Sequence, residues 1–201
     1  MKSPAESNVP RRTVLKTAGL LGLAAGVGMT GTAAAKKGDL KKQRDVEAFL
    51  NHPAAYKDGP IWDGTVEDMT GMAEVMVVTG AMTSVNIPEE PIPMAPVAFA
   101  PQAIEVDAGT EVVWTWAEYD PPVPPVPHDV VARKIVKGEP LFASELQYPA
   151  EAEDFSYIFE EPGEYLYYCT PHGAPFAVES FLGEMVNNEF GMRGAVIVRD
   201  A

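Results

Sequence analysis

Residues Glu164-Tyr-Leu-Tyr-Tyr-Cys169-Thr-Pro-His172-Gly173 combine a strand, a turn and two metal-binding side chains within ten positions of a 201-residue chain. The run Tyr165-Leu-Tyr-Tyr168 has strong β-propensity, so we expect Cys169 at the end of a strand. The Thr-Pro pair then favours a turn, which places His172 in the loop that follows. Because Cys169 is the single cysteine, an internal disulfide is excluded.

A second histidine and a methionine stand beside two other predicted strands. His128 opens the run His128-Asp-Val-Val-Ala132, and Met192 precedes the run Gly194-Ala-Val-Ile-Val198. One cysteine, two histidines and a methionine are the ligands of a blue-copper site, in which a His2Cys plane holds copper and a long thioether bond completes it. Zinc also suits imidazole and thiolate. A catalytic Cys–His pair is the other chemical alternative, but no third orienting group supports it.

Short strands separated by Gly and Pro turns recur along most of the chain. The proline-rich run 88–101 is expected at a sheet edge or in a loop, because proline cannot donate a ladder hydrogen bond. Residues 103–107 and 111–116 flank the turn Ala108-Gly109-Thr110, and we predict a hairpin there with Trp114 in the core. The other expected strands are 73–79 (ending at Gly80), 128–133, 142–144, 155–159 and 194–199. This pattern predicts an all-β sandwich or barrel.

The first 35 residues are expected to be an export signal. Arg11-Arg12-Thr-Val-Leu15-Lys16 resembles the twin-arginine motif, and Ala33-Ala34-Ala35 supplies small residues for cleavage near Lys36. The stretch 20–27 is too short and too weakly apolar to span a membrane permanently. The alternative is a segment retained as an N-terminal anchor.

A basic and polar lead over residues 36–70 is expected to precede the main domain, residues 71–201. Within the lead, an incomplete apolar stripe over 39–50 is compatible with a short helix. His52 lies between Asn51 and Pro53, which indicates a surface loop, and we do not expect it to bind metal.

The charge of the chain is distributed unevenly. Ten of the 15 Lys and Arg residues lie within residues 1–57, whereas 25 of the 29 Asp and Glu residues lie within residues 58–201, and the whole chain has a net charge of −14. A surface this acidic argues against nucleic acid as a partner, because phosphates require Lys and Arg. It favours life in high salt, where screening makes self-repulsion tolerable; the alternative is an acidic secreted protein from ordinary salt.

Seven short motifs follow one another in an order typical of one protein family. They are Asp63-Gly-Thr-Val-Glu-Asp68, Val106-Asp-Ala-Gly-Thr-Glu-Val-Val-Trp114-Thr-Trp116, His128-Asp-Val-Val131, Phe142-Ala-Ser144, Pro162-Gly-Glu-Tyr165, Tyr167-Tyr-Cys-Thr-Pro-His172 and Gly191-Met-Arg-Gly-Ala-Val196. The chain from about residue 63 to residue 201 thereby resembles the halocyanins, plastocyanin-like blue-copper proteins of haloarchaea within the cupredoxins. The resemblance implies a Greek-key β-sandwich with one type 1 copper at one end.

The resemblance also implies a role for each candidate site residue. His128, Cys169 and His172 take the positions of the family's two histidine ligands and its thiolate ligand, and Met192 takes that of the axial methionine. Asp129, which follows the first histidine, is expected to brace the cysteine loop from outside the ligand set.

The chain departs from the family pattern near the copper end. Residues 173–191 form a long insertion, in which Phe181, Leu182 and Met185 could line one face of a short helix. Met185 is therefore a rival to Met192 as axial ligand. Together with the proline-rich approach to His128, the insertion is expected to form a cap or docking surface that shields the edge of His172.

These features predict an exported one-electron carrier that is not an enzyme. Its expected cofactor is one copper, and its expected partners are redox proteins, soluble or membrane-bound, with no nucleic acid and no small-molecule substrate. Its expected location is extracellular or at the outer face of the cell membrane. A multicopper oxidase or a copper nitrite reductase is excluded as a self-sufficient enzyme, because only His52 remains to supply further ligands. The alternatives are an exported interaction or structural domain of the same fold, or a copper-delivery protein.

Overall fold

The computed structural model describes residues 37–51, 62–85, 92–119, 125–174, 178–179, 185–186 and 190–200. The expected signal over residues 1–35 and His52 lie outside these ranges. Helix α1 (Lys37–Leu50) occupies the lead, where the sequence is compatible with a helix. Among the described residues, no helix is long and apolar enough to cross a membrane. The division of the chain at residues 35 and 70 stays a prediction.

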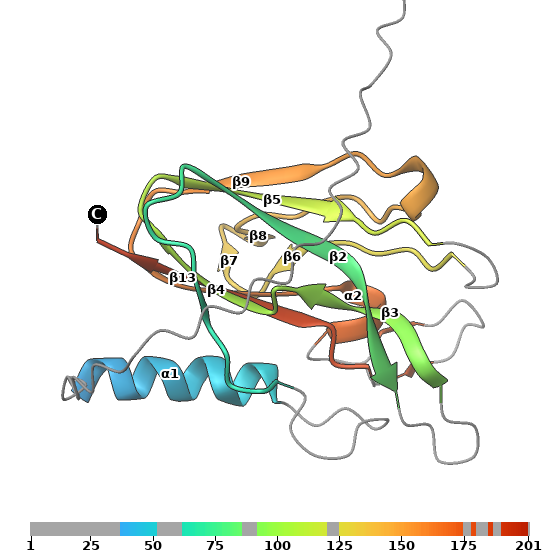
Figure 1. The fold of residues 1–201 in the computed structure, drawn as a ribbon, viewed down its shortest axis with the longest axis horizontal. Coiled ribbons are helices and arrows are strands. Elements are labelled where there is room, and N and C mark those ends of the chain that lie inside the picture. The colour runs from blue at the N-terminus through green and yellow to red at the C-terminus, as the bar shows by residue number, and fades with distance from the viewer. Residues whose placement is uncertain are drawn as a thin grey trace, which may run out of the picture. The chain divides into compact units, whose positions relative to one another are not determined.

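Two β-sheets make up most of the fold (Figure 1). The five-stranded sheet has the order β1 (Glu67–Asp68), β4 (Ala103–Asp107), β13 (Arg193–Arg199), β10 (Gly163–Tyr168) and β6 (Val131–Ala132). The four-stranded sheet has the order β3 (Ile92–Ala100), β2 (Glu74–Val85), β5 (Thr110–Trp116) and β9 (Phe155–Phe159). The smaller elements are the pairs β7 (Ile135–Val136) with β8 (Glu139–Pro140) and β11 (Val178–Glu179) with β12 (Met185–Val186), and the short helices η1 (Pro149–Glu151) and α2 (Thr170–Gly173).

The two sheets share one hydrophobic core, which confirms the predicted β-sandwich. On β5, Val112, Trp114 and Trp116 are buried and alternate with partly exposed residues, as expected for a strand with one face inward. Trp114 lies edge-on to Tyr167 of the opposite sheet, with ring centroids 5.3 Å apart. Such aromatic pairs across the sandwich join the two sheets over a large buried area.

The predicted hairpin over residues 103–116 is wrong, although both strands are present. β4 lies in the five-stranded sheet between β1 and β13, and β5 lies in the four-stranded sheet between β2 and β9. The turn at Ala108-Gly109 therefore carries the chain from one sheet to the other. Each strand finds its neighbours elsewhere: β4 pairs in parallel with β13, and β5 pairs in parallel with β2.

Strand β13 is buried on both faces, because α1 covers the side of its sheet that faces away from the core. Val196 and Val198 point into the sandwich core. Ala195, on the opposite face, belongs to a second cluster with Phe49 and Leu50 of α1. The lead helix is thus packed against β10 and β13 rather than lying apart from the domain.

The four-stranded sheet has proline-rich β3 at its edge, as predicted. Its neighbour β2 continues to Val85 instead of ending at Gly80. Gly80 adopts a positive φ of 81° inside this strand, and the pairing of β2 with β3 shifts register beyond Thr79. A bulged strand of this kind bends and redirects the side chains that follow.

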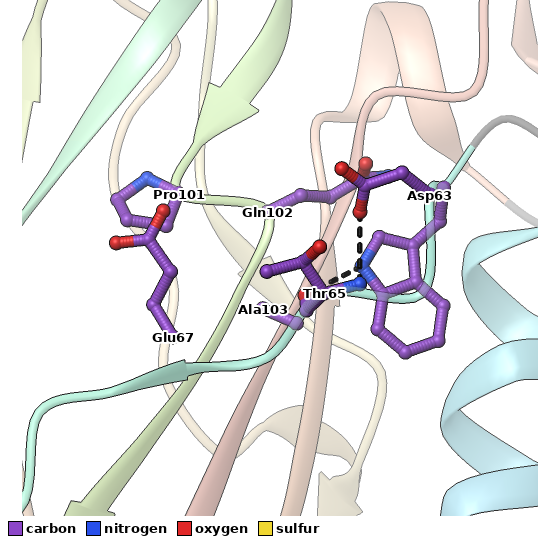
Figure 2. A pocket seen from close by; sticks show the side chains of 7 residues that line it. Asp63, Thr65, Glu67, Pro101, Gln102 and Ala103 are labelled. Atoms are coloured by element: carbon purple, nitrogen blue, oxygen red, sulfur yellow. Dashed lines mark hydrogen bonds between the residues drawn. The ribbon is translucent and has the colours of Figure 1, made fainter. Parts of the chain in front are cut away.

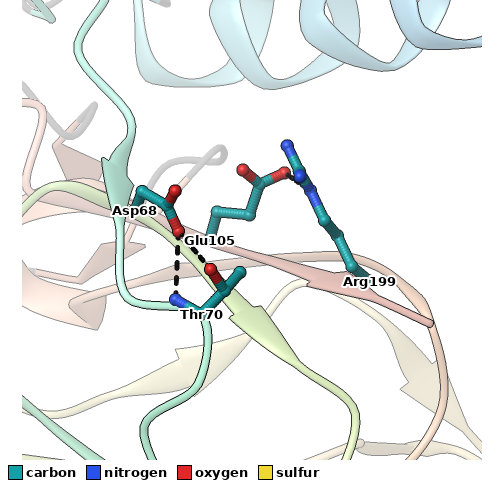
Figure 3. A network of polar contacts seen from close by, with 4 residues as sticks. All are labelled: Asp68, Thr70, Glu105 and Arg199. Carbon is teal, nitrogen blue, oxygen red and sulfur yellow. Dashed lines mark hydrogen bonds and ion pairs between the residues drawn. The ribbon is translucent and has the colours of Figure 1, made fainter. Parts of the chain in front are cut away.

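Polar contacts cluster at the end of β13 that lies away from Met192. There Arg199 forms an ion pair with Glu105 of β4, and nearby Asp68 Oδ1 accepts hydrogen bonds from the Thr70 hydroxyl (2.7 Å) and the Thr70 backbone N–H (3.0 Å) (Figure 3). These hydrogen bonds lower the pKa of Asp68. The seven residues of β13 put roughly 20 Å between this end and the start of the strand.

A small pocket of about 240 Å³ opens beside the first turn of the domain. Trp62 Nε1 donates to the Thr65 carbonyl at 2.9 Å, and the Thr65 N–H donates to Asp63 Oδ1 at 2.8 Å (Figure 2). These bonds close the turn that leads into β1, and Pro101 and Gln102 complete the pocket wall.

Candidate metal centre

Three side chains that could ligate metal converge at the end of the sandwich where β10 stops. The Cys169 Sγ lies 3.4 Å from His172 Nδ1 and 3.7 Å from His128 Nδ1. One donor atom from each residue lies within 4.8 Å of the other two, and within the described part of the chain this is the one such group of His, Cys, Asp or Glu. The cluster unites residues 41 positions apart in the sequence.

Cys169 and His172 are held by one turn of helix. Cys169 directly follows β10, and its carbonyl accepts the N–H of His172 at 3.2 Å and that of Gly173 at 2.6 Å. The expected loop around His172 is therefore wrong: Thr170–Gly173 form α2, with proline in its first turn where no N–H donor is needed. This turn places the His172 imidazole beside the Cys169 thiol.

His128 is fixed by the backbone of a neighbouring loop. It forms a two-way bridge with Gln147, with both N–H···O distances 2.9 Å, and the Trp116 indole N–H donates to the His128 carbonyl at 3.3 Å. The strand predicted to begin at His128 begins only at Val131. The His128 side chain is completely buried.

Gly80 and Tyr119 lie behind the His128 ring. The Tyr119 hydroxyl donates to the Gly80 carbonyl at 2.5 Å. A Cβ on Gly80 would lie 2.2 Å from the Tyr119 hydroxyl oxygen and 2.9 Å from His128 Nε2. The close packing of both rings against the bulge in β2 thus requires glycine.

Met192 is buried, and its backbone bonds to both Cys169 and His172. Its N–H donates to the His172 carbonyl at 2.9 Å, and its carbonyl accepts the Cys169 N–H at 3.1 Å. A Cβ on Gly173 would lie 1.8 Å from the Met192 carbonyl oxygen, so a glycine is needed for this approach. The start of β13 is therefore locked onto the Cys169–Gly173 turn.

Asp129 braces the cysteine turn, as expected from its place beside His128. Its Oδ1 accepts the Thr170 N–H at 2.5 Å. Burial raises the pKa of Asp129, although the hydrogen bonds from Thr170 act in the opposite direction. The carboxylate links the two segments that carry His128 and Cys169.

The environment keeps both imidazoles neutral at ordinary pH. Burial lowers the pKa of His172 to about 4, and burial together with the charge of His172 lowers the pKa of His128 to about 3. Burial, and next the charge of Asp129, raises the pKa of the Cys169 thiol. Neutral imidazoles leave a nitrogen lone pair for a metal, and a bound cation favours the thiolate over the thiol.

Met185 does not lie in the expected helix. Residues 178–179 and 185–186 pair as β11 and β12, so Met185 lies in a strand opposite Glu179. The side chain of Met185 and residues Phe181 and Leu182 lie outside the described part. At the end of the insertion, the Phe190 ring lies edge-on to the His172 ring, with centroids 5.8 Å apart. The insertion therefore covers part of His172 at Phe190.

The chemistry of the donors fits copper. Two neutral imidazoles and one thiol converge around a single point in a buried setting, and imidazole with thiolate is the donor set of a trigonal His2Cys copper site. A buried, preformed cluster of soft and borderline donors defines a mononuclear copper centre at the end of a β-sandwich.

Comparison with known proteins agrees with this class. The family described as copper binding proteins, plastocyanin/azurin family, matches residues 91–180. Halocyanin from Natronomonas pharaonis is 34% identical over 146 residues, which are 70% of this chain and 66% of halocyanin. The chain belongs to the plastocyanin/azurin family of copper-binding proteins.

Two plastocyanins are also similar to this chain. A plastocyanin from Synechococcus sp. (strain JA-2-3B'a(2-13)) is 29% identical over 39% of this chain and 57% of its own length. Among solved structures, oxidised plastocyanin from Dryopteris crassirhizoma is 23% identical, covers 62% of this chain and 99% of its own, and gives a TM-score of 0.38. This chain covers 66% of the length of halocyanin and 57% of the length of the Synechococcus plastocyanin, which is less than two thirds of each.

Three residues around the centre could not be identified from the sequence. Tyr119 and Gly80 meet behind His128, although they are 39 residues apart. Arg193 is buried beside Met192 and donates to Gly173. No local pattern marks these residues, because each is defined by a contact with a distant segment.

Arg193 remains charged despite its burial. Burial, and next the charge of Arg133, lowers the pKa of Arg193 to about 10, so the guanidinium stays cationic at neutral pH.

Proposed function

We propose that this chain is an electron carrier in which His128, Cys169 and His172 hold one copper and Met192 is its axial ligand. The observation that carries the proposal is the convergence of two imidazole Nδ1 atoms on one buried thiol, at 3.4 and 3.7 Å. When bound, copper supplies one-electron chemistry by alternating between Cu(II) and Cu(I).

The residues of the chain would serve transfer by holding the donor atoms still. The backbone bonds from Met192 to Cys169 and His172, and the two-way bridge from His128 to Gln147, fix the segments that carry the ligands. A donor set fixed by a close-packed core changes little when one electron arrives. Burial of Cys169 and His128 keeps water away from the metal.

Met192 is the better candidate for the axial position. Its burial and its two backbone hydrogen bonds to Cys169 and His172 support this role, whereas the backbone of Met185 pairs with Glu179 in the insertion. Met192→Leu should change the absorption spectrum and raise the reduction potential, because a thioether stabilises Cu(II) more than an alkyl chain does. Met185→Leu is the matched control and should change neither.

The decisive experiment compares wild type with Cys169→Ser after addition of Cu(II). We expect an intense blue absorption from the thiolate in wild type, reversible reduction at a defined potential, and loss of the colour in the variant. A folded wild-type protein that stays colourless would contradict the proposal and favour an interaction domain of the same fold. A blue protein without reversible reduction would favour copper delivery.

Export and partners belong to the same proposal. Arg11-Arg12 and the small residues 33–35 support export by the twin-arginine route, which would place the carrier outside the cell or at the outer face of the cell membrane. Its partners would be redox proteins, soluble or membrane-bound, and it would transform no substrate itself. Double substitution of Arg11 and Arg12 by lysine should leave an unprocessed precursor inside the cell, detectable by mass spectrometry.

A further inference from the structure

Arg193 connects the proposed copper ligands to the N-terminal helix. It follows Met192 directly, and the residue is only 2% exposed. Its Nε donates to the Gly173 carbonyl at 2.8 Å, and its Nη1 donates to the Phe49 carbonyl at 3.0 Å. One guanidinium therefore binds the residue after His172 and the last turn of α1 at the same time.

The end of α1 is well suited to hold this cation. The last carbonyls of a helix lack partners within the helix and carry the negative end of its dipole. The Arg193 guanidinium carbon also lies 5.1 Å from the centre of the Phe49 ring, a cation–π distance. Among the described residues, no carboxylate forms an ion pair with Arg193.

The charge lies close to the ligand segments. Gly173, which accepts from Arg193, is packed against the Met192 carbonyl, and Met192 in turn bonds to Cys169 and His172. A cation in a buried setting interacts strongly with other charges, because the local dielectric is low. It disfavours the oxidised, more positive state of a neighbouring metal and so raises the reduction potential.

We propose that Arg193 is a positioning residue that, anchored on α1, holds the His172 turn against Met192 and raises the reduction potential of the copper centre. This inference rests on the proposed function, since it needs a copper site to act on. It also gives α1 a role: the helix supplies the carbonyl and the ring that keep a cation buried beside the ligands.

The test uses the full chain with Arg193→Met and Arg193→Lys. We expect Arg193→Met to stay blue, to show a lower reduction potential, and to have an altered electron paramagnetic resonance spectrum. Lysine keeps the charge but not the two directed hydrogen bonds, so its potential should fall less. The matched control is Arg199→Met on the same strand, since Arg199 has a side chain 59% exposed at the other end of β13. Its potential should equal that of wild type.

A second variant tests the anchor without touching β13. Phe49→Leu keeps an apolar side chain in the α1 cluster but removes the ring beneath Arg193, so the potential should fall by less than in Arg193→Met. This variant also keeps the test informative if Arg193→Met does not fold. A lowered melting temperature with an unchanged potential and spectrum in Arg193→Lys and Phe49→Leu would overturn the inference and leave Arg193 as a structural residue. A colourless wild type would instead show that the proposed function itself has failed.

Discussion

His128 and His172 present the same nitrogen to the same thiol, yet they are held in different ways. His128 is completely buried, and its backbone is bridged to Gln147 and capped by Trp116. His172 is half-buried on a single turn of helix, with Phe190 against its ring. The difference in burial assigns the two histidines different roles in the proposed carrier. In that proposal, His128 would anchor the metal in the interior, and His172 would be the ligand nearer to the surface.

The strongest way to break this comparison is to remove each imidazole in turn. His128→Gly and His172→Gly should each weaken copper binding by more than about 100-fold, since loss of a ligand costs more than loss of an outer contact. Added imidazole should restore the blue colour only in His172→Gly, because His172 is partly exposed whereas His128 is completely buried. The measurement is a copper titration followed by absorption. Equal rescue of both variants would contradict the assigned anchor role of His128.

The two glycines beside the histidines give the next largest effect. Gly173→Ala places a Cβ 1.8 Å from a backbone oxygen of Met192, so the metal-free protein should lose about 3 kcal/mol or more of unfolding free energy. Gly80→Ala meets the ends of two side chains at a φ of 81° and should cost about 1–3 kcal/mol. Urea unfolding measures both. Gly109→Ala, at a φ of 95° with nothing within 4 Å, isolates the cost of the backbone angle alone and should cost least.

Acid should destabilise the metal-free protein through both histidines. In the folded state the pKa of His128 is about 3 and that of His172 about 4, against 6.5 for the free side chain. The unfolded chain therefore binds more protons between pH 6.5 and pH 4, so stability is present above pH 6.5 and is lost as the pH falls. The loss should be on the order of a few kcal/mol by pH 4. Urea unfolding at several pH values measures it, and His172→Gln should show a shallower decline; an equally steep one would exclude His172 as a cause.

The smallest expected effect concerns the cover over His172. Phe190→Ala removes a ring whose centroid lies 5.8 Å from that of His172, so electron exchange with a small soluble oxidant should become several-fold faster. The absorption spectrum should stay the same, because Phe190 is not a ligand. Stopped-flow oxidation measures the rate, and Ile158→Ala, an exposed position on the outer face of the four-stranded sheet, is the control. Equal rates in the two variants would show that Phe190 does not shield the ring.

The sequence predicted those parts of the fold and centre that depend on local pattern. Alternation along residues 110–116 identified the inward face of β5, including Trp114. The spacing of Cys169 and His172 needed only one helical turn to bring both donors together. His128 was identified by its place before a strand, and the sandwich then closes the gap of 41 residues between it and Cys169.

The rest depends on contacts that no local pattern reveals. A short turn between residues 103–107 and 110–116 has the same sequence pattern whether the two strands pair with each other or enter different sheets. They enter different sheets because β4 pairs with β13 and β5 pairs with β2. Within the insertion, the described residues 178–179 and 185–186 pair as β11 and β12, and the sequence around Met185 carries no local signal for that pairing. Arg193 gained its importance from a helix 144 residues away.

The lock between Met192 and the Cys169–Gly173 turn also determines the order of assembly. As the chain leaves the ribosome, the thiol and both imidazoles emerge before β13, yet the turn that carries two of them is held by the first residues of that strand. Closure further requires β13 to pair with β4, some 90 positions earlier, and to meet α1 near the start of the described chain. Contacts of such sequence separation form late and slow the folding of β proteins. The turn that carries Cys169 and His172 therefore gains its support from Met192 only after β13 has been synthesised and paired.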